Sequence, residues 1–198
     1  MQTKGFIMTL PNKITIGRII LAPVFFISYF LPSRWPSLNG LSSILILSIF
    51  AGIEISDFLD GYLARKYNLV SDLGKVLDPF ADVISRVTYF LCFVSSGLMP
   101  LWIFLIIIYR ELGITFLRMM MISRGVVVAA SLWGKLKAIT YAVSGVLGVL
   151  FVSFERFGIF SDIMKPLRIS LIIVFYLSAF AAVASFLVYL KAAKKIGK

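Results

Sequence analysis

The sequence predicts an all-α, polytopic membrane protein with six transmembrane helices, and three observations lead to this prediction. Of its 198 residues, 60% are hydrophobic and 15% are charged, whereas roughly a quarter of a soluble domain is charged. Its mean hydropathy is +0.99, which is more apolar surface than one soluble core of this size can bury. The apolar residues form separate runs, each near the roughly 20 residues that a helix needs to cross a bilayer.

Six apolar runs follow one another along the chain, and each is expected to form one membrane-spanning helix. They cover residues 14–31, 38–59, 78–97, 101–121, 135–154 and 167–190. The first run contains Arg18 and is too long for a cleaved signal peptide. Pro32 and Pro36 predict a tight turn after it, because proline does not continue a helix. Six spans leave only short loops and tails, so residues 1–198 are predicted to form a single transmembrane domain.

Lysine and arginine are distributed unevenly over the predicted loops, and this predicts the orientation. The N-terminal tail, the second and fourth connections and the C-terminal tail are richer in them than the other connections. The positive-inside rule therefore places both termini in the cytoplasm, in a multi-pass protein of the cell's inner (plasma) membrane. The net charge of +11 is interpreted as loop charge and contact with anionic lipid, and not as nucleic-acid binding.

The residue types exclude several kinds of chemistry. The chain has no histidine and a single cysteine, Cys92. Internal disulfides, the usual zinc sites and histidine-activated nucleophiles are therefore excluded. Any reaction has to use carboxylates, lysines and arginines, with a hard metal ion as a further option.

The acidic residues are concentrated in one segment. Six of the nine lie between Glu54 and Asp82. Asp57 and Asp60 share a face at the end of the second predicted helix, and Asp78 and Asp82 share a face at the start of the third. Two antiparallel helices joined by a short cytoplasmic loop can bring these pairs together. Carboxylates at membrane depth are costly, which indicates a functional site that faces the cytoplasm.

Four converging carboxylates repel one another and need cations. One pair of like charges at about 4 Å costs on the order of 4 kcal/mol at an effective dielectric constant near 20. Oxygen ligands favour magnesium or manganese, and two such ions balance four aspartates. The alternative is that the aspartates only end helices or pair with basic residues of the intervening loop: Arg65, Lys66 and Lys75.

The spacing of these residues carries further information. The full string is Asp57-x2-Asp60-Gly61-x2-Ala64-Arg65-x8-Gly74-x3-Asp78-x3-Asp82. Its small residues allow a backbone to approach a bulky ligand closely, and an arginine is suited to phosphate. All eight positions match the complete signature of the CDP-alcohol phosphotransferase family, which the chain therefore resembles.

This resemblance implies a reaction and a set of roles. The family displaces CMP from a CDP-linked donor, usually CDP-diacylglycerol, with the hydroxyl of an alcohol. By resemblance, Asp57, Asp60 and Asp78 hold two divalent cations, Mg²⁺ or Mn²⁺, and Asp82 contacts the second. Asp82 is also the expected catalytic general base. The CDP-binding residues implied are Asp60, Gly61, Ala64, Arg65 and Gly74. Members are commonly homodimers, so we expect a homodimer here.

Other segments resemble the bacterial phosphatidylglycerophosphate synthases. They are Leu10-Pro11-Asn12-x-Ile14-Thr15-x-x-Arg18, Leu77-Asp78-Pro79-x-Ala81-Asp82, Arg110-Glu111 with Arg118, and Gly134-Lys135-x-Lys137. This likeness implies glycerol 3-phosphate as the acceptor. A phosphorylated acceptor needs positive charge, and the candidates to bind it are Arg110, Arg118, Lys135 and Lys137.

Two alternatives stay open. Val83 and Tyr141 stand where these synthases carry other residues, so a sister activity with inositol phosphate, serine or another alcohol is possible. Intramembrane carboxylates also mark ion pathways, so a cation transporter is the alternative from a different class. The near absence of charge from the outer halves of the six predicted helices favours a one-sided catalytic pocket.

Overall fold

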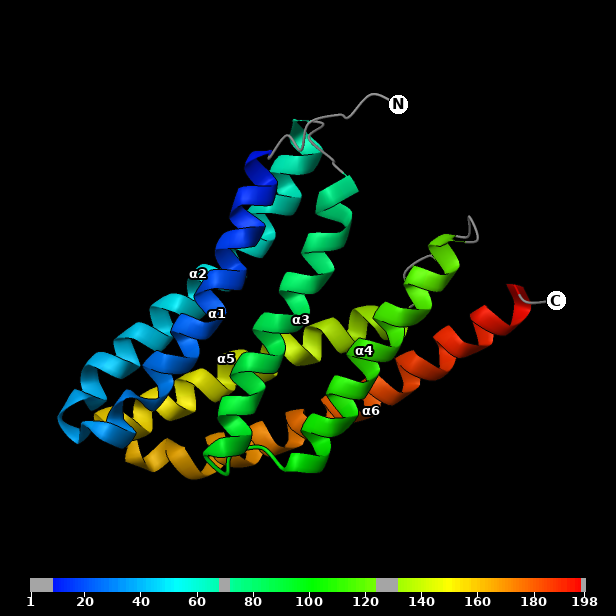
Figure 1. Cartoon of the computed structure of the whole chain (residues 1–198). Helices are drawn as coiled ribbons and strands as arrows, with labels where there is room; N and C mark the ends of the chain where they lie inside the picture. Colours follow the sequence, from blue (N-terminus) through cyan, green and yellow to red (C-terminus); the bar gives the residue numbers. More distant parts are fainter. Residues whose placement is uncertain (1–8, 68–71, 124–131, 197–198) are drawn as a thin grey trace. The chain divides into compact units, whose positions relative to one another are not determined.

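The computed structural model describes residues 9–67, 72–123 and 132–196 (Figure 1). Within these residues the chain forms six α-helices and a short 3₁₀ helix, and it has no strand. The elements are α1 (Leu10–Arg34), η1 (Pro36–Leu38), α2 (Asn39–Lys66), α3 (Asp72–Ser95), α4 (Leu101–Ser123), α5 (Leu132–Phe157) and α6 (Ser161–Ile196). Each α-helix overlaps one of the six predicted runs, which confirms the all-α prediction.

Four segments of the described residues are long and apolar enough to cross a membrane. They are Leu10–Arg34, Pro36–Leu63, Leu132–Phe157 and Ser161–Lys191. Helices α3 and α4, with 24 and 23 residues, are also long enough, but they carry at least three charged residues in every 18-residue stretch. The charges that set these two helices apart belong largely to the predicted site: Asp78 and Asp82 in α3, and Arg110 and Arg118 in α4. The chain is thus a polytopic membrane protein with polar groups built into two of its helices.

The chain divides into two compact units, Met1–Tyr89 and Phe90–Lys198, and helix α3 passes from one to the other. In the first unit, α1 and α2 lie side by side and antiparallel, joined by Trp35 and η1 (Figure 1). The part of α3 that belongs to this unit is linked to them by side chains, such as the edge-to-face contact of Tyr89 with Phe50 at 5.5 Å between ring centroids.

The predicted turn at Pro32–Pro36 begins later than expected, because α1 continues through Pro32 to Arg34. Proline lacks the N–H that would bond the carbonyl four residues back, which here is the buried carbonyl of Ser28. The hydroxyl of Ser42, in α2, donates to this carbonyl at 2.6 Å. A side chain of the neighbouring helix thus replaces the missing backbone bond, and the turn itself is reduced to Trp35 and η1.

In the second unit, α6 packs against both α4 and α5. The centre of this unit is aromatic: Phe90 lies edge-to-face against Tyr141 and Phe175, with ring centroids 5.7 and 6.5 Å apart. Gly148 of α5 makes room for this cluster, because a Cβ there would lie 2.4 Å from the ring of Phe93. A side chain at this position cannot be accommodated without moving a fully buried ring.

Helices α3 and α5 end in the same way, each with a glycine in the left-handed conformation. At the first end, Gly97 has φ +71°, its N–H donates to the Val94 carbonyl and the N–H of Leu98 donates to Phe93. Gly158 repeats this pattern with φ +66° after α5. These are Schellman caps, which satisfy carbonyls left open at the helix ends and allow the chain to reverse within a few residues.

The Ser42→Ala variant tests the bond across α1 and α2. Because it leaves a buried carbonyl without this donor, we expect a loss of about 1–3 kcal/mol of stability. The measurement is thermal unfolding of the purified protein in detergent. The control is Ser43→Ala, a buried neighbour whose hydroxyl bonds only within its own helix, to the carbonyl of Asn39. Equal effects of the two substitutions would contradict the role assigned to Ser42.

Candidate active site

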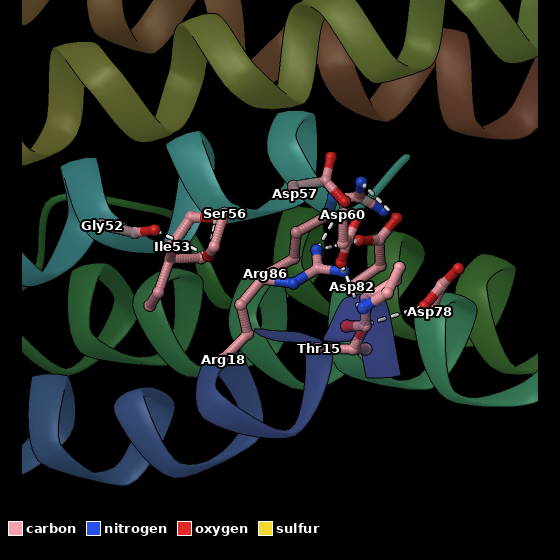
Figure 2. Close-up of polar contacts among 11 residues, drawn as sticks. Thr15, Arg18, Gly52, Ile53, Ser56, Asp57, Asp60, Asp78, Asp82 and Arg86 are labelled. Atoms are coloured by element: carbon pink, nitrogen blue, oxygen red, sulfur yellow. Dashed lines mark hydrogen bonds and ion pairs between the residues drawn. The ribbon is translucent and has the colours of Figure 1, made fainter. Parts of the chain in front are cut away.

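Polar side chains of the first unit gather where α1, α2 and α3 face one another (Figure 2). They are Thr15 and Arg18 from α1, Asp57 and Asp60 from α2, and Asp78, Asp82 and Arg86 from α3. On each helix these residues are three or four positions apart, which places them on one face. The structure therefore brings together the four motif aspartates, as the sequence predicts, and adds Thr15, Arg18 and Arg86, which were not assigned a role from the sequence.

Arg18 lies at the centre of this cluster. Its side chain is only 1% exposed. Its Nη1 donates to Asp57 Oδ1 at 2.5 Å and to Asp82 Oδ1 at 3.0 Å, and its Nη2 donates to Asp60 Oδ2 at 2.7 Å. One guanidinium thus joins three carboxylates from two helices. An arginine stays charged at every relevant pH, so it offsets part of the repulsion among them.

Thr15 lies one helical turn before Arg18 and contacts the fourth aspartate. Its Oγ1 lies 2.9 Å from Asp78 Oδ1, 3.0 Å from Asp60 Oδ2 and 3.0 Å from the carbonyl oxygen of Pro11. A hydroxyl has one proton, so it can donate fully to only one of these three oxygens. The other two oxygens lie at hydrogen-bond distance from Thr15 Oγ1 but receive no proton from it. Oxygen atoms gathered in this way are typical of a site that holds positive charge.

The cluster is buried on one side and open on the other. Asp60 is 4% exposed, whereas Asp57 is 50% exposed. A small cavity at the open side is lined by Arg18, Glu54, Asp57, Asp82 and Arg86, among others. Arg86 Nη2 donates to the second oxygen of Asp82 at 3.0 Å, so both oxygens of this carboxylate contact a guanidinium. A ligand can therefore approach the cluster from the Asp57 side.

The donor set suits the divalent cations that the resemblance implies. Four carboxylates and two guanidinium groups leave two negative charges unbalanced among these side chains. The atoms of the aspartates and of Thr15 that could coordinate a metal ion are all oxygens, which Mg²⁺ and Mn²⁺ prefer. In the described residues, however, no group of three carboxylates is placed to hold one metal ion, because Arg18 lies between them. Metal binding by Asp57, Asp60, Asp78 and Asp82 stays a prediction.

The predicted CDP-binding residues belong to the end of α2 and the start of α3. Gly61 is half-buried, Gly74 is buried, and Asp60 belongs to the arginine-bridged cluster. The side chains of Ala64 and Arg65 lie outside the described part of the structure. Their nucleotide role stays a prediction.

Two of the four predicted acceptor-binding residues form a buried cluster in the second unit. Arg110 Nη1 and Lys137 Nζ both donate to Glu111 Oε1, at 2.9 and 2.7 Å. Arg110 Nη2 also donates to Ser185 of α6 at 2.7 Å. The ammonium of Lys137 lies 4.5 Å from the ring centroid of Tyr141, one turn further along α5. These contacts join α4, α5 and α6 through buried charges.

The other two predicted acceptor-binding residues, Arg118 and Lys135, have exposed side chains. Arg110 and Lys137 differ from them, because both are buried and Arg110 Nη1 and Lys137 Nζ already donate to Glu111. Of the four predicted acceptor-binding residues, Arg118 and Lys135 can therefore contact a new ligand without first breaking a buried ion pair.

The roles of Thr15, Arg18 and Arg86 were not predicted from the sequence. One signal was present: Arg18 is a charge within an otherwise apolar run, and a charge in such a place needs a partner. Its partners are 39 to 64 residues away in the chain, so helical periodicity alone does not identify them.

Comparison with known proteins identifies the family of the chain. The sequence profile of the CDP-alcohol phosphatidyltransferase family matches residues 8–193. The chain therefore belongs to this family.

Three similar proteins share one name. A protein of Treponema pallidum (strain Nichols) is 40% identical over 194 residues, covering 93% of this chain and 88% of the relative. A protein of Bacillus subtilis (strain 168) is 41% identical over 146 residues, covering 70% of this chain and 76% of the relative. A protein of Rickettsia felis is 31% identical over 187 residues, covering 94% and 96%. Each is named CDP-diacylglycerol–glycerol-3-phosphate 3-phosphatidyltransferase.

The Glu111→Gln variant tests the buried charges of the second unit. Two buried cations lose the negative charge that both contact, so we expect a loss of roughly 3–5 kcal/mol of stability. Thermal unfolding in detergent measures it. The matched control is Glu155→Gln, because Glu155 is exposed on α5. A small effect at Glu111, similar to that at Glu155, would show that Arg110 and Lys137 do not depend on this carboxylate.

Proposed function

We propose that the chain transfers the phosphatidyl group of CDP-diacylglycerol to glycerol 3-phosphate, releasing CMP and forming phosphatidylglycerophosphate. The observation that carries this proposal is the meeting of all four signature aspartates in one cluster that is open on one side. Membership of the CDP-alcohol phosphatidyltransferase family and the names of relatives that cover most of the chain support it.

The proposal includes two divalent cations, Mg²⁺ or Mn²⁺, held by Asp57, Asp60, Asp78 and Asp82. The oxygen-only donors and the two unbalanced negative charges support it. When bound, such ions neutralise the diphosphate of the donor and stabilise the departing CMP.

The protein's own residues have two tasks in the transfer. Asp82 takes the proton of the acceptor hydroxyl. The oxygen of this hydroxyl attacks the phosphatidyl phosphorus, and the bond from the phosphorus to the CMP oxygen breaks. To accept the proton, Asp82 has to release one of the two guanidinium groups that it contacts. Gly61, Ala64, Arg65 and Gly74 line the nucleotide pocket in this proposal. Direct displacement also suits a chain without histidine.

Acceptor binding is assigned to the basic residues of the second unit. Glycerol 3-phosphate carries about two negative charges, which basic side chains have to offset. Arg118 and Lys135 are exposed and supply charge directly. Arg110 and Lys137 contribute from the buried cluster with Glu111.

The cellular setting follows from the distribution of charge. We place the protein in the inner (plasma) membrane with both termini and the aspartate cluster on the cytoplasmic side, as the positive-inside rule indicates. A homodimer in contact with anionic lipid is part of the same proposal.

The acceptor is tested with the variants Arg118→Gln and Lys135→Gln. Each removes one charge-assisted contact with phosphate, so the KM for glycerol 3-phosphate should rise about 10- to 150-fold. The KM for CDP-diacylglycerol should hardly change. The assay follows CMP release and labelled product with glycerol 3-phosphate, inositol phosphate, serine and inositol as acceptors. Lys165→Gln, an exposed lysine of α6, is the control. A wild-type preference for serine or inositol would overturn the acceptor while family membership stands.

Metal dependence is the second test of the proposal. Chelation of divalent cations should abolish CMP release, because the carboxylates otherwise repel the incoming diphosphate. Added Mg²⁺ or Mn²⁺ should restore it, and Ca²⁺ should restore it poorly, since its coordination is looser. The measurement is the initial rate of CMP release by the purified protein. Full activity in excess chelator would show that the reaction does not need divalent cations and would contradict this part of the proposal.

A further inference from the structure

Arg18 bonds the atoms that the divalent cations are proposed to bind. Its two terminal nitrogens contact one oxygen each of Asp57, Asp60 and Asp82 (Figure 2). A guanidinium that contacts a carboxylate oxygen takes up one of its lone pairs and places a positive charge beside it, so it opposes a metal ion that approaches the same oxygen. In this structure, therefore, the arginine and a cation compete for the same ligands.

We propose that Arg18 is a built-in competitor of the divalent cations. Its guanidinium holds the carboxylates together in the metal-free protein, and it has to release Asp57, Asp60 and Asp82 before a cation is fully bound. This inference rests on the proposed function, because the cations are part of that proposal. It assigns to Arg18 a positioning role that sets metal affinity.

The chemistry of arginine supports competition by displacement. A guanidinium does not lose its proton in proteins, so its charge leaves the ligands only when the side chain moves. Its attachment is also one-sided. Among the residues that the structure describes, the buried Nε–H of Arg18 has no hydrogen-bond partner, and the guanidinium bonds the carboxylates through Nη1 and Nη2. No bond at Nε fixes the group in this position when the carboxylates turn to a metal ion.

The burial of Arg18 explains why competition is strong. Its side chain is 1% exposed and that of Asp60 is 4% exposed, so water screens their attraction little. A cation that binds the carboxylates has to displace the charge-assisted bonds that Arg18 makes with them. An arginine on the surface would impose a much smaller cost, because exposed ion pairs contribute little.

The experiment measures Mn²⁺ binding directly, without CDP-diacylglycerol. Electron paramagnetic resonance of free Mn²⁺ gives the dissociation constant for the full-length protein in detergent. Arg18→Gln removes the competitor, and we expect it to bind Mn²⁺ about ten- to a hundredfold more tightly, the equivalent of one charge-assisted bond. Arg18→Lys keeps the charge but not the planar fork, so it should give an intermediate constant. The control is Arg34→Gln, the same substitution at an exposed position of the same helix, and it should bind as the wild type does.

A second readout separates competition from loss of structure. Without Mn²⁺, Arg18→Gln should unfold at a lower temperature than the wild type, since its carboxylates lose their counter-charge. Saturating Mn²⁺ should raise its unfolding temperature by more than it raises that of the wild type, because tighter binding stabilises more at the same concentration. If Arg18→Gln does not fold, Arg18→Lys carries both measurements.

The outcomes distinguish this inference from the proposed function. If the wild type binds Mn²⁺ and both Arg18 variants bind it equally well or more weakly, Arg18 supports the metal site and the inference is wrong. If wild type and variants all bind no Mn²⁺, the cations are removed from the proposed function and the inference falls with them. Binding only by the variants would support competition in its strongest form. Transfer from CDP-diacylglycerol, assayed separately, tests the reaction itself.

Discussion

The arrangement of the first unit depends on the attraction between one buried guanidinium and the carboxylates of two other helices. Arg18 of α1 reaches Asp57 and Asp60 of α2 and Asp82 of α3, and Thr15 adds Asp78. Helices α1 and α2 approach closely along their length, whereas α3 is linked to them by these polar side chains and by the aromatic contact of Tyr89 with Phe50. The charges that define the site are therefore also part of what holds α3 in the unit. Separating catalysis from stability by substitution at Arg18 or the aspartates is correspondingly difficult.

The sequence predicted the features that follow from local rules. Hydropathy located the six helices, and helical periodicity with the motif spacing placed Asp57 with Asp60 and Asp78 with Asp82. The helix ends were less well predicted, because hydropathy marks only the apolar part, and α6 continues to Ile196 through a lysine-rich stretch. The partners of Arg18 depend on how three helices pack, which no local pattern records. Pro32 shows the same limit, because Ser42 from another helix allows α1 to continue past it.

The two units use buried charge differently. In the first, negative charge is in excess around the arginine and the cluster is open at Asp57, which suits a site that receives cations or a ligand that carries them. In the second, Arg110 and Lys137 share one acceptor atom of Glu111, so positive charge exceeds negative among these three side chains. Buried ion pairs are weak evidence for stability, since desolvation offsets much of their attraction. Their excess charges are more informative, because they match the opposite charges of the proposed cations and the proposed phosphorylated acceptor.

The Ser42–Ser28 bond fixes the axial register of α1 against α2 at the end of the pair remote from the aspartates. Ser28 lies ten residues beyond Arg18 on α1, a separation of about 15 Å along a helix. Both partners of this bond are uncharged, so ionic strength and metal concentration act on it weakly. When the charges around Arg18 change, the two helices are thus prevented from sliding past each other by a clamp that those charges do not reach. Rearrangement at the aspartates then takes place by rotation of side chains, and the backbone of the site stays in register for the next substrate.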